Sequence, residues 1–129
     1  MMAPDDRTAL EWMVREARAR ERRPPLHRDA RLDRIAQTHA EAMQSARRVA
    51  HDVGDGDPGA RVQAAGLDVR IAGENVARAL TLNRAHRALW ASPSHRSNLL
   101  DPRFEAVGIG IVRDPDGTVW AAEVFADFR

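Results

Sequence analysis

Cysteine and lysine are both absent from this 129-residue sequence, and each absence removes a class of chemistry. Without cysteine there are no disulfide bonds, thiolate metal ligands or cysteine nucleophiles. All 20 basic residues are arginine, which excludes a Schiff-base lysine and the lysine of a phosphate-binding loop. No apolar run approaches the ~20 residues that span a bilayer, and the N-terminus carries no apolar signal-peptide segment.

Charge is nearly balanced, with 20 basic and 19 acidic residues. Nucleic-acid binding draws its affinity from an excess of cations, so we expect no nucleic-acid partner. The arginines within residues 15–23 alternate with glutamates, which predicts a solvated, ion-paired helix face. With 43% hydrophobic residues, we expect one monomeric domain over residues 5–129.

Apolar residues recur at helical spacing in several segments, which predicts helices over 5–22, 29–47 and 82–91. A short helix is expected over 58–65, with Gly66 as its stop, and a capped turn over 95–99. Segment 69–79 fits neither a helix nor a strand clearly. Near the C-terminus, Asp114-Pro115-Asp116-Gly117 is a turn signal between two apolar runs and predicts a β-hairpin. Helices first and a hairpin last indicate an α+β fold.

The histidines differ in their settings. His39 lies within an apolar helical stripe and is expected to be a core residue with a hydrogen-bond partner. His27 and His86 are expected to be partly exposed. His51 opens an Asp/Gly-rich loop and His95 follows a Ser-Pro break, positions where functional residues concentrate.

No local spacing among these residues matches a metal motif. The aspartates of residues 52–57 resemble a calcium loop but lack its terminal glutamate. Ser92, Ser94 and Ser97 could be nucleophiles beside His95, although helix capping explains them more simply.

Several motifs follow one another in an order that is typical of one protein family. These are Ala50-His51, Arg61-x-x-x-Ala65-Gly66, Gly73-Glu74-Asn75, Trp90-x-Ser92-Pro93-Ser94-His95-Arg96 and Phe104-x-x-Val107-Gly108-Ile109-Gly110. The chain resembles the CAP superfamily (cysteine-rich secretory proteins, antigen 5 and pathogenesis-related 1 proteins), in particular its compact bacterial branch. The resemblance covers residues 8–128, nearly the whole chain.

The resemblance implies a three-layer α-β-α sandwich with a small, mainly antiparallel sheet, and a surface cleft where two histidines meet acidic residues. It assigns the metal-ligand histidines to His51 and His95 and the first glutamate to Glu74. The family's second glutamate, after the tryptophan of the Trp90 helix, is missing here. Glu123, on the last strand, could point toward the cleft, but it is expected to be exposed, as strand glutamates ordinarily are. The family is mostly secreted, which implies an extracellular or cell-envelope location.

Three functions are compatible with these residues. The first is a non-enzymatic module at the cell surface that binds a small ligand, lipid or peptide, with weakly bound Zn²⁺ between His51 and His95. The second is a metal-dependent hydrolase with the same two ligands and Glu74 as general base. In the third, the three side chains only connect loops through hydrogen bonds. The first is favoured, because the acidic set is incomplete.

Overall fold

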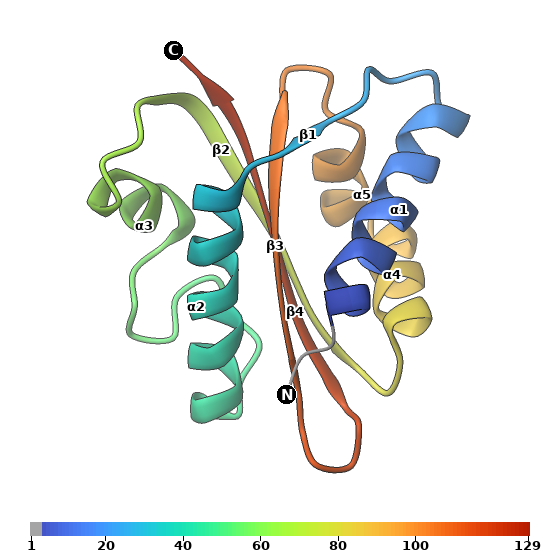
Figure 1. The fold of residues 1–129 in the computed structure, drawn as a ribbon, viewed down its shortest axis with the longest axis vertical. Helices are drawn as coiled ribbons and strands as arrows, with labels where there is room; N and C mark the ends of the chain where they lie inside the picture. The colour runs from blue at the N-terminus through green and yellow to red at the C-terminus, as the bar shows by residue number, and fades with distance from the viewer. Residues whose placement is uncertain (1–3) are drawn as a thin grey trace.

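A four-stranded sheet lies between two layers of helices in the computed structural model, which describes residues 4–129 (Figure 1). Helices α2 and α3 cover one face, and α1, α4 and α5 cover the other. This is the expected three-layer α-β-α arrangement. The helices are α1 (Pro4–Arg20), α2 (Ala30–Ala46), α3 (Pro58–Ala64), α4 (Leu82–Ala91) and α5 (Pro93–Leu100). The strands are β1 (His27–Arg28), β2 (Val69–Ala79), β3 (Ala106–Arg113) and β4 (Val119–Phe128).

The sheet has the order β1-β3-β4-β2. Strands β3 and β4 form the predicted C-terminal hairpin, and β2 pairs antiparallel with β4 along its other side. Only β1 runs parallel to its neighbour β3. Strand β2 therefore forms one edge of the sheet, next to the hairpin.

Side chains alternate along β4 between two cores. Val119, Ala121 and Phe125 face α1, α4 and α5, where Phe125 stacks on Phe104 with ring centroids 5.4 Å apart. Trp120 and Val124 face α2 and α3. Both faces of the central strand are thus buried, which makes β4 the shared wall of the two cores.

Two glycines of β3 allow α2 to lie directly on the sheet. A Cβ atom on Gly108 would stand 2.0 Å from the carbonyl carbon of Leu32, and one on Gly110 would stand 2.2 Å from that of Ala36. Neither contact is physically possible, and both involve backbone that cannot rotate away. The alternation of glycine with Ile109 and Ile111 therefore sets the closeness of the helix to the strand.

The outer side of β3 lies beside β1 for only two residues, and side chains take over beyond it. Asp33 accepts a hydrogen bond from the Ile109 amide at 2.9 Å, and Arg7 donates to the Ile109 carbonyl at 2.8 Å. Gln37 accepts from the Ile111 amide at 2.9 Å and donates to the Ile111 carbonyl at 3.1 Å. These side chains occupy the backbone groups that a neighbouring strand would use.

The structure confirms most predicted elements and resolves the open ones. The helix over 82–91 and the hairpin occur as predicted, and the first helix ends at Arg20, just before the prolines. The capped turn over 95–99 is a full helix, α5. Segment 69–79 is the long strand β2, and β1 has no counterpart among the predicted elements.

The prediction of a solvated arginine face on the first helix is wrong for Arg18. Its side chain is fully buried and donates to three backbone carbonyls, those of Pro24, Leu99 and Asp101, at 2.8–3.0 Å. Arg15 does form the expected ion pair with Glu11 at 3.0 Å. Arg18 thus connects α1 to the end of α5 through the hydrogen bonds of its buried side chain.

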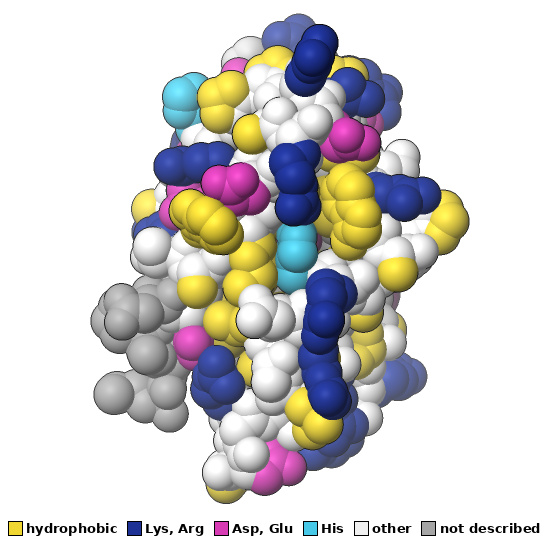
Figure 2. All heavy atoms as spheres, turned by 90° about the vertical axis from the view of Figure 1, so that its right-hand side faces the viewer, with side chains coloured by type: hydrophobic (Ala, Val, Ile, Leu, Met, Phe, Trp, Pro, Cys, Tyr) yellow, Lys and Arg dark blue, Asp and Glu magenta, His cyan; other side chains and the backbone are white. Residues whose placement is uncertain are grey.

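Figure 2 shows the face formed by the α1, α4 and α5 layer, where arginine side chains lie among hydrophobic ones. Arg20 of α1 and Arg96 of α5 both lie over the ring of Trp90, at 6.0 and 5.6 Å from its centroid. These contacts hold the aliphatic stems of the arginines against the protein while their charges stay near solvent.

Candidate functional site

The three residues assigned from the sequence come from three elements around the edge strand β2. His51 lies in the loop after α2, Glu74 lies in the middle of β2, and His95 lies in the first turn of α5. Because α2 and α5 cover opposite faces of the sheet, the site spans the edge of the sheet. Burial lowers the pKa of His95, and the nearby charge of a protonated His51 lowers it further.

Glu74 is buried and both of its carboxylate oxygens are occupied. Oε1 accepts a hydrogen bond from Nδ1 of His51 at 2.9 Å, and Oε2 accepts one from Nη2 of Arg61 at 2.7 Å. The Arg61 cation compensates the buried carboxylate, as buried charges require. This arrangement suits a residue that orients His51 and leaves no free oxygen for a substrate or a metal ion.

Both histidines are held through Nδ1. A carboxylate only accepts hydrogen bonds, so Nδ1 of His51 is the donor to Glu74, and in the neutral ring Nε2 carries the lone pair. Nδ1 of His95 lies 2.9 Å from the hydroxyl oxygen of Ser92, which accepts when Nδ1 is the donor. The side chain of His51 is 52% exposed. With Nδ1 as the donor in both rings, Nε2 is left as the ligand atom, which is how proteins commonly orient metal-binding histidines.

His39 confirms the prediction of a core histidine and positions the loop before His51. It is fully buried in α2, with Nε2 donating to the Ala50 carbonyl at 2.9 Å and Nδ1 lying 2.6 Å from Oδ2 of Asp55. Burial favours a higher pKa for Asp55, but hydrogen bonds from His39 and the Val53 amide outweigh it and lower that pKa. Both ends of the 51–55 loop are thereby tied to α2.

Glu123 corrects the sequence analysis, because it is fully buried and not exposed. It lies on β4 opposite Asn75 of β2, and Nδ2 of Asn75 donates to its Oε1 at 3.2 Å. The same amide donates to the His95 carbonyl at 3.1 Å, and Asn98 donates to Oδ1 of Asn75 at 3.0 Å. Burial raises the pKa of Glu123 to about 7. This network supports the first turn of α5 from below.

The donor set fits an open metal site with two protein nitrogens. Within residues 4–129 there is no group of three or more histidine, aspartate or glutamate side chains arranged to hold a metal ion. An ion at His51 and His95 would therefore take its other ligands from water or from a bound molecule, and two nitrogens alone bind weakly.

Sequence reasoning did not find the roles of Arg61, Ser92 and Asn98. The contacts that define their roles join residues 3 to 24 positions apart in the sequence.

The Asp-rich loop of residues 52–57 is held by its own hydrogen bonds. Asp52 accepts from the Gly54 and Gly56 amides, and Asp57 caps α3 through the Ala60 amide. None of the described helices is both long and apolar enough to cross a membrane.

Known proteins share this fold and part of this sequence. The family model of the cysteine-rich secretory protein (CAP) family matches residues 13–125. The uncharacterized protein YkwD of Bacillus subtilis is 29% identical over 127 residues, covering 94% of this chain and 49% of that protein. The chain thus spans about half the length of this curated relative.

Two solved structures show the same fold. An outer surface protein of Borrelia burgdorferi superposes with a TM-score of 0.93 at 21% identity, covering 100% of this chain and 97% of the other. An extracellular protein of Bacillus anthracis that contains an SCP domain gives a TM-score of 0.85 at 23% identity, covering 98% of this chain and 44% of the other. Together with the family match over residues 13–125, these findings show that the chain belongs to the cysteine-rich secretory protein (CAP) family.

Proposed function

We propose that this CAP domain acts outside the cytoplasm as a non-enzymatic binding module, in which His51 and His95 hold a divalent metal ion weakly. The main support is that both imidazoles are tethered through Nδ1, His51 by Glu74 and His95 by Ser92. The extracellular location is supported by the names of the outer surface protein of Borrelia burgdorferi and the extracellular protein of Bacillus anthracis.

Zinc is the ion that these ligands suit, because imidazole nitrogen is among its common ligands. A neighbour with the same fold, NaASP2, has a structure determined with Zn²⁺; it is 10% identical, with a TM-score of 0.66 over 96% of this chain and 80% of that one. In this chain, His51 and His95 would supply the two nitrogens, and Glu74 would fix the His51 ring. A bound Zn²⁺ would supply open positions for an oxygen or nitrogen atom of a small ligand, lipid headgroup or peptide.

Glu74 has the role of a positioning residue in this proposal. A general base needs an oxygen within reach of the proton it removes. Here both oxygens are engaged and the side chain is 0% exposed, so the geometry favours binding over hydrolysis.

Calorimetric titration with Zn²⁺ at pH 7.5 tests the proposal. We expect saturable 1:1 binding by the natural chain and none by the His51→Ala/His95→Ala double variant. His27→Ala is the matched control, because His27 is exposed on β1 and belongs to no part of the site. Glu74→Gln should weaken Zn²⁺ binding about 10–100-fold, the usual effect of losing a group that orients a ligand.

Three other results would contradict this proposal. Equal Zn²⁺ binding by the double variant would place the metal elsewhere. No binding, together with a loss of about 1–3 kcal/mol of stability in Glu74→Ala, would indicate a purely structural cluster. Peptide hydrolysis that stops with chelator and disappears in Glu74→Gln would support the metal-dependent hydrolase.

A further inference from the structure

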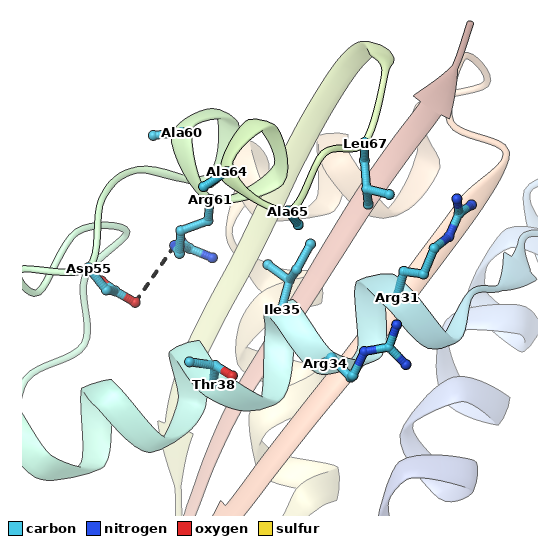
Figure 3. A pocket seen from close by; sticks show the side chains of 10 residues that line it. All are labelled: Arg31, Arg34, Ile35, Thr38, Asp55, Ala60, Arg61, Ala64, Ala65 and Leu67. Carbon is cyan, nitrogen blue, oxygen red and sulfur yellow. Dashed lines mark ion pairs between the residues drawn. The ribbon is translucent and has the colours of Figure 1, made fainter.

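A groove of about 630 Å³ lies between α2 and α3 (Figure 3). Arg61, in its wall, also contacts Glu74 and the His51 carbonyl. The walls of the groove include Arg31, Arg34 and Ile35 of α2, Arg61 and Ala64 of α3, and Leu67 of the following loop. Pockets that hold small molecules commonly have volumes of about 300–1,000 Å³ and a largely apolar lining with a few polar groups. The groove has both properties.

Arginine side chains mark the end of the groove that lies toward the start of α2 (Figure 3). Arg31 is neutralised by Asp29, with the two side chains 2.8 Å apart, and its guanidinium also lies over the ring of Phe128. Arg34 is exposed, and among the side chains that the structure describes no carboxylate forms an ion pair with it. This end of the groove therefore carries a positive charge that an anionic group would compensate.

Arg61 forms the other end, beside Asp55 (Figure 3). Its side chain is only 8% exposed, with Nε donating to the Gly56 carbonyl and Nη2 to Glu74 and the His51 carbonyl. Its Nη1 atom is buried and has no acceptor within the described residues. An unsatisfied buried donor is costly, and more so when it is charged. A bound acceptor at this end would remove that cost.

The middle of the groove is apolar. Ile35 of α2 lies opposite Ala64 of α3 and Ala65, the residue that follows this helix, and Leu67 closes the side toward the sheet (Figure 3). The small side chains of the alanines leave open space beside α2. Ile35 and Leu67 are only partly buried by the core beneath them. These side chains would gain from contact with an apolar molecule.

We propose that the α2–α3 groove binds a small organic anion with an apolar body. Its carboxylate, sulfonate or phosphate group would lie at Arg34, and its apolar part would lie against Ile35, Ala64 and Leu67. This site is distinct from the His51/His95 site and does not depend on the metal. The two sites share Arg61, which donates to Glu74 from the wall of the groove.

Two fluorescent probes of nearly equal shape test the charge requirement. 8-Anilinonaphthalene-1-sulfonate has an apolar ring system and one negative charge, and N-phenyl-1-naphthylamine is the same ring system without the sulfonate. We expect saturable 1:1 binding of the sulfonate, and binding at least about tenfold weaker for the neutral probe, since one charged hydrogen bond has roughly that effect.

Two variants test the place of binding. Arg34→Gln removes the unpaired charge and should weaken the sulfonate about tenfold while leaving the neutral probe unchanged. Ala64→Phe fills the groove and should abolish binding of both probes. Arg87→Gln is the matched control, because Arg87 is an exposed arginine on α4, beyond the sheet, and its loss changes the net charge equally.

Near-UV circular dichroism and thermal unfolding should show that each variant keeps its fold. This control excludes probe binding to hydrophobic surface that partial unfolding would expose. Equal affinity for the two probes, undiminished binding by Ala64→Phe, or an equal effect of Arg87→Gln would each overturn the proposal. The Zn²⁺ titration is independent of all these variants, so failure here leaves the histidine site to be judged separately.

Discussion

Asn75 donates a hydrogen bond from Nδ2 to Oε1 of Glu123 across 3.2 Å, in the interior between β2, β4 and α5. The other oxygen of Glu123 is buried without a hydrogen-bond partner among the described residues. A carboxyl group in this setting is more stable with its proton than without it, because burial penalises the charged form.

Stability should therefore fall as the pH rises. Burial raises the folded-state pKa of Glu123 from 4.5 to about 7, so the folded chain holds a proton that the unfolded chain releases. The stabilisation is complete below pH 4.5 and is lost as the pH rises through 7, with a total of up to about 3 kcal/mol.

Glu123→Gln keeps the acceptor for Asn75 and cannot ionise. Urea unfolding between pH 5 and 8 should show a smaller decrease with pH in this variant than in the natural chain, and a higher stability at pH 8. Glu21→Gln, at the exposed turn that follows α1, is the control and should give the same pH dependence as the natural chain. Parallel curves for Glu123→Gln and the natural chain would contradict the prediction.

A single added methyl group on β3 should unfold or strongly distort the α2 layer. Gly108→Ala and Gly110→Ala would each place Cβ within about 2 Å of α2 backbone atoms, so the helix must move away from the strand. We expect a loss of about 3 kcal/mol or more, measured by thermal unfolding, since overpacking against rigid backbone exceeds the usual 1–3 kcal/mol. Gly59→Ala in α3 is the same substitution with a nearest contact of 3.4 Å, and it should be neutral or slightly stabilising.

Removing Arg18 should destabilise the chain, although none of the acidic side chains that the structure describes forms an ion pair with it. Arg18→Met keeps an apolar stem but removes the donor to three carbonyls, of which that of Leu99 is buried and those of Pro24 and Asp101 are partly buried. The Asp101 carbonyl keeps the Phe104 amide as a second donor. The expected loss is about 2–4 kcal/mol in urea unfolding. Arg15→Met removes an exposed ion pair with Glu11 and should cost less than about 0.5 kcal/mol. Equal effects of the two variants would show that the buried contacts of Arg18 are not what matters.

The Ser92 hydroxyl should affect metal binding and not folding. In Ser92→Ala, the His95 ring loses the partner that fixes Nδ1, so Zn²⁺ affinity should fall about 10–100-fold with an unchanged unfolding temperature. Ser94→Ala is the control, because among the described residues the Ser94 hydroxyl contacts the Ser92 hydroxyl alone, at 3.5 Å. A loss of stability without a change in affinity would indicate that Ser92 serves α5 and not the site.

Local sequence patterns were sufficient to predict the helices and the hairpin, because each segment itself contains the apolar spacing and the turn residues that define it. Strand β2 could not be predicted in the same way. Its Glu74 and Asn75 are polar yet buried, and the partners that permit this burial, Arg61 and Glu123, lie 13 and 48 positions away. The two-residue strand β1 is too short to show any periodicity.

The site was located in outline from the sequence, through the motif residues His51, Glu74 and His95. Its chemistry was not, because the roles depend on which atom faces which. Only the tertiary structure shows that Arg61 neutralises Glu74 and that both imidazoles are held by Nδ1. Glu123 was misplaced for the same reason: strand alternation gives the face of a residue but not what covers that face.

Asp33, Gln37 and Arg7 cover the outer side of β3. This cover also affects whether the protein aggregates at high local concentration. An uncovered strand is a template on which further chains can add, one after another, into fibres. Here the hydrogen-bonding groups of Ile109 and Ile111 are already used within the same molecule. Crowding of this protein on a surface would therefore not recruit β3 into intermolecular sheets, even though no disulfide bond fastens the hairpin.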